Sequence, residues 1–367
     1  MTELPQGVAV ARDAKTVLPH RPVRPAVRIG PISAVRRPAV LTTVLALAVA
    51  LVVLAVLDVW LGGDPIPLPQ LINALTGGGT GAQRFIVWEL RMPRTATALI
   101  VGAALGLSGA ITQSVLRNPL AAPDLLGITA GASLAATAAT VAGGAFAASL
   151  FGVPLAALLG GLLTAAAIYL FAWRGGEVAG FRLALIGIGV NAMLVAGVGW
   201  LLVSAQIQDV GRAQVWLNGS LDDTSWTRFW PTATAFVIVL AITLAAARSL
   251  AALRFGPEIA RSLGVRVQWN QGLLLTAAAA LAALATSACG PIAFVALAAP
   301  QIARRITGAA GEPLFGSALT GAVLITGSDL LARAILPENL PVGVVTAGFG
   351  GCYLLFSLVR SNRKATL

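Results

Sequence analysis

The chain has 367 residues, of which 57% are apolar and 11% are charged, against about a quarter charged in an ordinary soluble domain. Its net charge of +11 would suggest a nucleic-acid surface in a soluble protein, but apolar stretches recur along the whole chain after about residue 39. The composition therefore excludes a soluble globular fold and a nucleic-acid partner. It predicts one polytopic, all-α membrane domain over residues 39–367.

The first 38 residues are rich in proline and arginine and too polar to bury a core, so we expect a disordered, basic cytoplasmic tail. The next segment, Val40–Trp60, has about the 20 residues that cross hydrocarbon. Because that length exceeds the apolar core of a secretory signal, we interpret it as a retained first helix. His20, the one histidine in the sequence, lies in the tail, which excludes a metal or haem site built on histidine.

Ten apolar segments are long enough, or nearly so, to cross a membrane as helices. They are Val40–Trp60, Thr95–Val115, Leu125–Phe146, Val153–Trp173, Leu183–Val203, Phe229–Ala247, Gly272–Ala288, Ile292–Ile306, Phe315–Arg333 and Gly343–Val359, and the eighth is the shortest. Long apolar runs exclude a β-barrel, whose strands would alternate in segments of about ten residues.

Small residues repeat inside the second segment at Gly102, Gly106 and Gly109. Glycines at such spacing let helix backbones approach closely, so we expect tight packing within one bundle.

The charges predict the orientation. With ten spans and a cytoplasmic N-terminus, most of the 25 lysines and arginines fall in the tail and the inside loops, as the positive-inside rule requires. Both termini are therefore expected in the cytoplasm. Six arginines remain outside against this bias: Arg84, Arg91, Arg94, Arg212, Arg228 and Arg333.

The spans contain no cluster of titratable groups that would indicate catalysis, so no catalytic residue, metal or cofactor is assigned to this chain. Neither lysine, Lys15 or Lys364, follows a glycine-rich phosphate loop. Any ATP must therefore be hydrolysed by another subunit. Cys289 and Cys352 lie far apart in apolar runs and are interpreted as small buried residues.

A proton-coupled carrier is the rival kind of transporter, and such carriers usually keep a carboxylate near the bilayer midplane. Here Asp58, Asp124 and Asp329 fall near span ends instead. Asp329 lies one helical turn before Arg333, which predicts a local ion pair. These positions favour an energy source outside the chain.

The first candidate site is the set of outside arginines at span ends, Arg91, Arg94 and Arg333. As exposed rim charges they would suit an acidic partner that docks from outside, and as simple lipid-headgroup anchors they would have no partner.

The second candidate site is the inside stretch Arg254–Asn270. Pro257 suits the first turn of a short helix and Gly264 suits its end. With Ile259, Ala260 and Leu263 expected on one side, the helix would fit a partner's groove, or else lie as an ordinary interfacial helix.

Several motifs together resemble the FecCD-type permeases of type II ABC importers, which carry iron–siderophores, haem or vitamin B12. They run from about Leu90 to Arg360 as LRMPR, GAALGLSGAITQSVLRNPLAAPDLLG, LIGIGVNAML, FGPEIARSLGV, GPIAFVALAAPQIAR, SDLLAR and LPVGVVTAGFG. Each motif is weak alone, but the set in this order is specific.

The resemblance implies ten helices per subunit in a bacterial cytoplasmic membrane and a dimer with a second, identical or paralogous permease. It also implies two ATPase subunits that bind ATP and magnesium, and a substrate-binding protein outside. Arg91, Arg94 and Arg333 match positions that receive glutamates from the binding protein. The coupling element of the family matches Gly256, Pro257, Glu258, Ala260, Leu263 and Gly264, and the translocation pathway matches Asn191, Gln113 and Asn118.

The chain departs from the usual pattern of the family at Ala296, Gln301 and Cys352, where Gly, His and Pro are frequent. The Ala/Gln variant resembles permeases for catecholate-type siderophores. The leading hypothesis is therefore a permease for a ferric siderophore. Cobalamin or haem as cargo, a proton-coupled carrier and a membrane-embedded enzyme are the alternatives.

Overall fold

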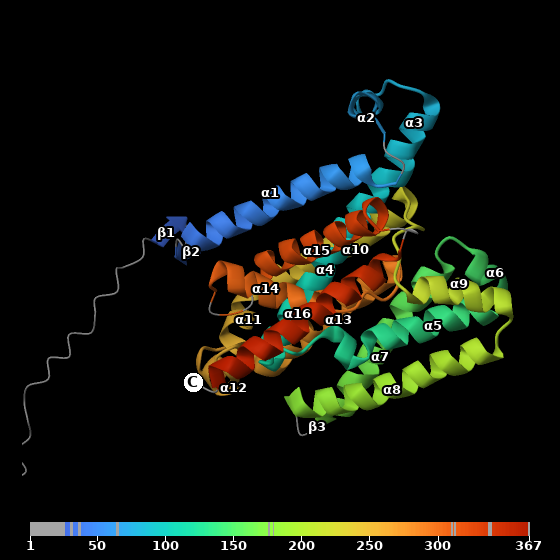
Figure 1. Cartoon of the computed structure of the whole chain (residues 1–367). Helices are drawn as coiled ribbons and strands as arrows, with labels where there is room; N and C mark the ends of the chain where they lie inside the picture. Colours follow the sequence, from blue (N-terminus) through green and yellow to red (C-terminus); the bar gives the residue numbers. More distant parts are fainter. Residues whose placement is uncertain are drawn as a thin grey trace, which may run out of the picture.

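The computed structural model describes residues 26–29, 32–35, 38–63, 66–174, 177–178, 180–309, 311, 313–336 and 340–365. Ten main helices form the bundle in Figure 1. They are α1 (Pro38–Leu61), α4 (Met92–Leu116), α5 (Ile128–Ala142), α7 (Gly152–Ala172), α8 (Gly180–Ser204), α10 (Trp226–Ala245), α13 (Val267–Cys289), α14 (Val295–Thr307), α15 (Leu314–Ala334) and α16 (Val342–Ala365).

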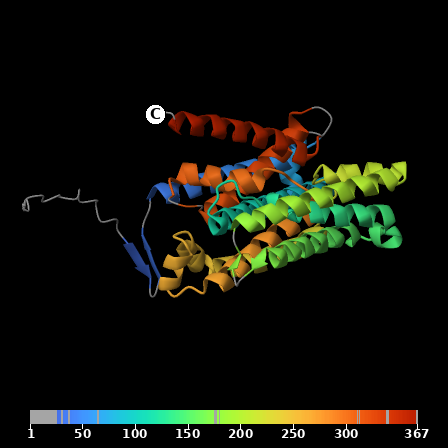
Figure 2. The same cartoon turned by 90° about the horizontal axis from the view of Figure 1, so that it is seen from below.

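Shorter elements connect the main helices at the two ends of the bundle. At the end predicted to face outside lie α2 (Leu68–Leu75), α3 (Gly81–Phe85), a π-helical turn η1 (Ile86–Arg91), α6 (Gly144–Ala148) and α9 (Ile207–Leu217). At the opposite, inner end lie the 3₁₀ turn η2 (Pro123–Leu126), α11 (Ala247–Leu253) and α12 (Pro257–Ser262). Figures 1 and 2 show α12 and the end of α16 at the same, inner end of the bundle but on different sides of it, as the predicted topology allows.

All ten predicted segments are helical in the structure, which confirms the all-α prediction. Seven helices within the described residues are long and apolar enough to cross a membrane, and α5 and the apolar part of α16 are shorter. The eighth predicted segment became α14, whose 13 residues span only about 20 Å.

Helix α14 is short because the residues just before it are not helical. Phe294 adopts left-handed backbone angles with φ of 68° and Ile292 is buried, so the connection from α13 enters the bundle before α14 begins. Irregular backbone is tolerated at that depth because protein surrounds it.

The second predicted segment, α4, is the central helix of the bundle, packed against α13, α14 and α15. A Cβ atom at Gly102 or Gly106 would overlap backbone carbonyl oxygens of α15, and one at Gly109 would overlap that of Ala296 in α14. The predicted role of these glycines in close helix packing is therefore confirmed. By contrast, α16 lies at the edge of the bundle (Figure 2), against α15 and α14.

Two small strand pairs were not predicted. Ala26–Ile29 (β1) pairs antiparallel with Ile32–Val35 (β2), and Trp173–Arg174 (β3) pairs with Glu177–Val178 (β4). The first pair lies in the predicted tail, where β-branched residues favour strands. Most of the rest of that tail, including His20, lies outside the described residues.

The cysteine prediction is half right. Cys289, in the packed helix α13, is buried, but Cys352 is exposed because α16 lies at the bundle edge.

Candidate functional site

The outer end of α4 begins with an irregular turn that positions Arg91. Pro93 has no N–H and its ring clashes with a regular preceding turn, so the helix widens there into η1, with the Met92 N–H bonded to the Val87 carbonyl. The Arg91 Nη1 atom donates to the carbonyls of Val59 and Trp60, each at 2.9 Å. Arg91 thus satisfies carbonyls in the last turn of α1, where a cation also complements the helix dipole.

Beside Arg91 lies a cluster of five charged side chains that we call the outer ion-pair cluster: Asp58, Arg94, Asp222, Asp329 and Arg333. Arg94 binds Asp329 through two atoms, with Nε 2.9 Å from Oδ2 and Nη2 2.8 Å from Oδ1. Arg333 donates to the same carboxylate from Nε at 3.1 Å and to Asp58 Oδ1 from Nη2 at 2.7 Å. The cluster joins α1, α4 and α15.

Asp58 and Asp329 are fully buried, and the side chains of Arg94 and Arg333 are only 12% and 9% exposed. Thr95 also donates to Asp58. Removing one partner from such a buried pair leaves an uncompensated charge and typically costs about 3–5 kcal/mol. The predicted local pair between Asp329 and Arg333 is confirmed, within a larger network.

Asp222 attaches the loop between α9 and α10 to this cluster by an ion pair with Arg94. It is the surface member, with 65% of its side chain exposed. Partial burial would raise the pKa of Asp222, but the hydrogen bond from Ser220 and the charge of Arg94 lower that pKa below its ordinary value. The carboxylate is therefore ionised at neutral pH.

The expectation that Arg91, Arg94 and Arg333 are solvated rim charges is wrong, because all three are buried or nearly so and bonded inside the chain. Sequence reasoning missed Asp58 and Asp222 as their partners. A signal did exist, since acidic residues stand near the same membrane face as the unusual outside arginines. Docking through these arginines stays a prediction.

The loop between α9 and α10 packs closely against the bundle at three glycines. The Ser220 N–H bonds the Cys289 carbonyl at 2.8 Å, and the Gly343 N–H bonds the Gly219 carbonyl at 3.0 Å. Side chains at Gly219, Gly290 or Gly343 would overlap neighbouring backbone carbonyls. The loop is thus tied to α13 and α16 as well as to α4.

At the inner end, α12 forms the short helix that the sequence predicted at Pro257–Ser262. It starts after Gly256, whose φ of 104° suits glycine, and ends before Gly264, whose φ is 80°. Ala260 is fully buried, whereas Glu258, Ile259 and Leu263 are exposed. The expectation that Ala260 shares the exposed face with Ile259 and Leu263 is therefore wrong: Ala260 anchors the helix, and the other two face away from the bundle.

The loop before α12 contacts the inner end of α4. Arg254 Nη2 lies 3.4 Å from Ser114 Oγ. A Cβ atom at Gly256 would lie 3.4 Å from Nη1 of Arg117, the left-handed C-cap residue of α4. The exposed helix α12 is thus positioned against the central helix of the bundle.

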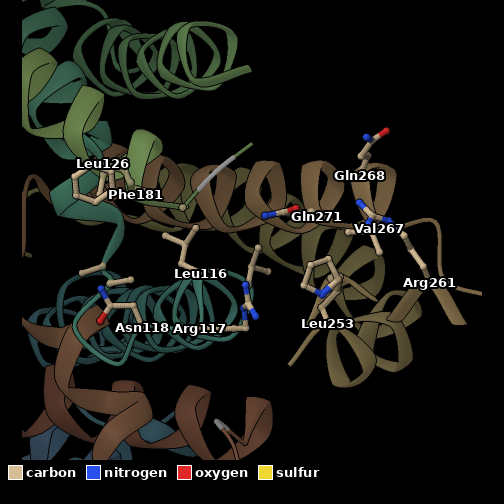
Figure 3. Close-up of a pocket in the computed structure, with 16 residues that line it drawn as sticks. Leu116, Arg117, Asn118, Leu126, Phe181, Leu253, Arg261, Val267, Gln268 and Gln271 are labelled. Carbon is tan, nitrogen blue, oxygen red and sulfur yellow. The ribbon is translucent and has the colours of Figure 1, made fainter. Parts of the chain in front are cut away.

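A cavity of about 520 Å³, which we call the inner cavity, lies between the inner ends of α4, α8, α12 and α13 (Figure 3). Asn118 lines this cavity, and its side chain is oriented by a local hydrogen bond in which its Oδ1 accepts the Leu120 N–H at 2.9 Å. Arg117, Arg261, Gln268 and Gln271 add polar atoms to the walls.

The other predicted pathway residues lie elsewhere. Gln113 is buried in the core and its amide nitrogen donates to the Leu297 carbonyl at 3.1 Å, so it links α4 to α14. Asn191 is half-buried on α8, whose backbone packs there against Gly127. Gln301 donates to the Pro119 carbonyl at 2.7 Å, which ties α14 to the loop after α4.

Comparison with known proteins places these features in context. The FecCD transport family matches residues 50–360. The chain is 41% identical over 325 residues to the ferric enterobactin transport system permease protein FepG of Escherichia coli, covering 88% of this chain and 97% of that protein. It is 38% identical to the iron(3+)-hydroxamate import system permease protein FhuG of Bacillus subtilis, covering 85% and 95%. A solved metal-chelate type ABC transporter in an inward-facing conformation superposes with a TM-score of 0.74 at 27% identity, covering 88% of this chain and 99% of that one.

Proposed function

Because this chain belongs to the FecCD transport family, we propose that it is the membrane-spanning permease subunit of an ABC importer that moves a ferric siderophore across the bacterial cytoplasmic membrane. The observation that carries the proposal is the 41% identity to a ferric enterobactin permease along 97% of that protein's length. Cobalamin and haem are the alternative cargoes, and the assay below distinguishes them.

The proposal assigns energy supply to two ATPase subunits that bind ATP and magnesium and that contact α12. Support comes from the two faces of this helix. Ala260 fixes it to the bundle, while Ile259 and Leu263 stay exposed where a partner's groove could take them. Glu258 lies exposed beside them and can add a polar contact at the rim.

A proton-coupled carrier is disfavoured by the state of two of the three candidate carboxylates; the third, Asp124, lies in the turn η2 at the inner end and accepts a hydrogen bond from Thr129. Asp58 and Asp329 are both bonded to arginine and fully buried. A carboxylate fixed in this way is a poor proton carrier, because protonation would strand the arginine beside it.

The proposal also places a substrate-binding protein on the outer end. Arg94 has two partners, the buried Asp329 and the exposed Asp222. A glutamate of the binding protein could take the place of Asp222 without unpairing a buried charge. Replacing Asp222 with Asn should then strengthen association with the binding protein, since it removes the competitor inside the chain; weaker association would count against this contact.

The second permease subunit would pack on the exposed apolar surfaces of α8 and α16, which include Met193 and Phe349. Asn191 on α8 would then face the path between subunits. Of the residues expected to line the pathway, Asn118 lines the inner cavity, and Gln113 is reassigned to the core.

The test is uptake by the purified complex. The tagged chain is isolated from membranes with the proteins that bind it and reconstituted in liposomes. Uptake of a radiolabelled ferric catecholate is compared with that of a ferric hydroxamate, haem and cobalamin, with and without Mg-ATP. We expect ATP-dependent uptake of a ferric siderophore. Uptake driven by a proton gradient without ATP, or restricted to cobalamin or haem, would overturn the corresponding part of the proposal.

A further inference from the structure

A second hollow adjoins the inner cavity. This apolar crevice, of about 270 Å³, lies between α5, α7, α8 and α13 and shares Leu126 with the inner cavity. On α13, Gln271 lines the cavity and Leu275, one turn further along, lines the crevice. On α8, Ala184 lines the inner cavity and its neighbour Leu183 lines the crevice. The two hollows therefore run end to end along α8 and α13.

The walls of the two hollows differ in chemistry. Arg117, Arg261 and Gln271 supply N–H donors to the inner cavity, and the described residues that line it include no carboxylate (Figure 3). The crevice is lined almost entirely by leucine, isoleucine and alanine. One end thus suits a hydrated anion and the other suits a hydrocarbon chain.

The crevice opens on a surface suited to lipid. Leu170 lines it with 70% of its surface exposed, and α7 also exposes Leu163 and Phe171. Next to them the rings of Tyr169 and Trp173 lie 5.6 Å apart at the inner end of α7. Tyrosine and tryptophan concentrate at the membrane–water boundary, which puts the junction of the two hollows at headgroup level.

From this geometry we propose that each subunit binds one anionic phospholipid of the inner leaflet, with its phosphate in the inner cavity and one acyl chain in the crevice. Arg117 and Arg261 supply the positive charge, and the amide of Gln271 on α13 bonds the phosphate or a glycerol hydroxyl. Basic pockets between helices at the cytoplasmic side suit such headgroups.

This site is compatible with a protein partner on α12. Pro257 and Arg261 line the inner cavity and lie one turn apart on one side of the helix. Ile259 and Leu263 are exposed on the other side. A bound lipid would therefore hold α12 to the bundle from within while its outer face stays open.

The test measures lipid binding to the full-length chain in detergent micelles. Dioleoyl phosphatidylglycerol is titrated against dioleoyl phosphatidylcholine, with bound lipid counted by native mass spectrometry and affinity taken from the shift in melting temperature. Glycerol phosphate and inorganic phosphate test the headgroup chemistry without chains. Arg117→Gln with Arg261→Gln removes the charge, and Arg248→Gln, an exposed inner-end arginine outside the cavity, is its control.

We expect one tightly retained phosphatidylglycerol per chain, with affinity reduced about fivefold for each cavity arginine removed and unchanged in the control. Ala166→Trp, which fills the crevice, should release the lipid, whereas Leu163→Trp on the exposed face should not. An unchanged preference in the double arginine variant would overturn the proposal. Equal stabilisation by glycerol phosphate or inorganic phosphate would also overturn it, because the site would then bind a soluble anion.

Discussion

The outer ion-pair cluster makes a quantitative prediction for Asp329→Asn. The wild-type carboxylate is fully buried and accepts hydrogen bonds from Arg94 and Arg333. Asparagine keeps the shape but loses the charge, and turns an N–H₂ donor toward a guanidinium. Breaking a buried pair costs about 3–5 kcal/mol. Since Arg94 keeps Asp222 and Arg333 keeps Asp58, we expect the lower end, about 3 kcal/mol of unfolding free energy.

The measurement is reversible unfolding in mixed micelles, followed by circular dichroism, with Asp209→Asn as the matched control. Asp209 pairs with Arg212, whose side chain is 69% exposed, so its loss should cost at most about 0.5 kcal/mol. Adding Arg333→Gln to Asp329→Asn should cost less than the sum of the two single changes, because the variants share one interaction. If Asp329→Asn destabilises no more than the control, the cluster does not contribute to stability as argued.

Three further predictions concern the role of α12, the topology and the packing of α4. Changing Ile259 and Leu263 to Asp should leave the fold intact and abolish ATP-dependent uptake by the assembled importer; normal uptake would show that α12 is not the coupling element. A reporter after the last residue should lie in the cytoplasm and one in the α9–α10 loop outside, and an exterior C-terminus would contradict the span count. Gly106→Val should lower the free energy of unfolding by about 1–3 kcal/mol or more, because the new side chain would overlap the Ser317 carbonyl. Gly189→Val, in open space on α8, should be tolerated. Equal stabilities of the two variants would refute the packing argument.

The long spans could be predicted because a run of about 20 apolar residues has few other stable environments. The first residue of α14 could not be predicted, because it depends on how Ile292 and Phe294 pack in the bundle just before the helix. A short helix within a buried connection carries no separate length signal in the sequence.

The partners of the arginines could not be predicted for a related reason. Asp58 and Asp329 stand in different spans, 271 positions apart by number, and only the packing of α1 against α15 brings both to Arg333. The local i,i+4 pair between Asp329 and Arg333 was predicted because it depends on helix geometry alone.

The buried side of α12 could not be predicted because the helix is short. With six residues, the helix has too few turns for its apolar periodicity to identify the buried side. The sequence grouped Ala260 with Ile259 and Leu263, but the small side chain is the one that fits against the bundle. Gln113 was assigned to the translocation pathway by the resemblance alone; in the structure its side chain is buried, and its amide nitrogen donates to the Leu297 carbonyl of α14.

Helix α4 connects the two candidate regions in physical terms. Its 25 residues span about 38 Å. Arg94, near the outer end, belongs to the outer ion-pair cluster, and Ser114, near the inner end, lies beside Arg254 before α12. Between these ends the glycine contacts with α15 leave no room for the helices to slide independently. Coupling between two sites requires a structural element that can adopt two conformations, and both sites must shift the equilibrium between these conformations. At the outer end, a partner's carboxylate could replace the exposed Asp222 beside Arg94, whereas the bond to buried Asp329 could not be given up without stranding a charge. A change at Asp222 would therefore act on α4 and α15 as one rigid unit, whose inner end contacts the loop that leads into α12.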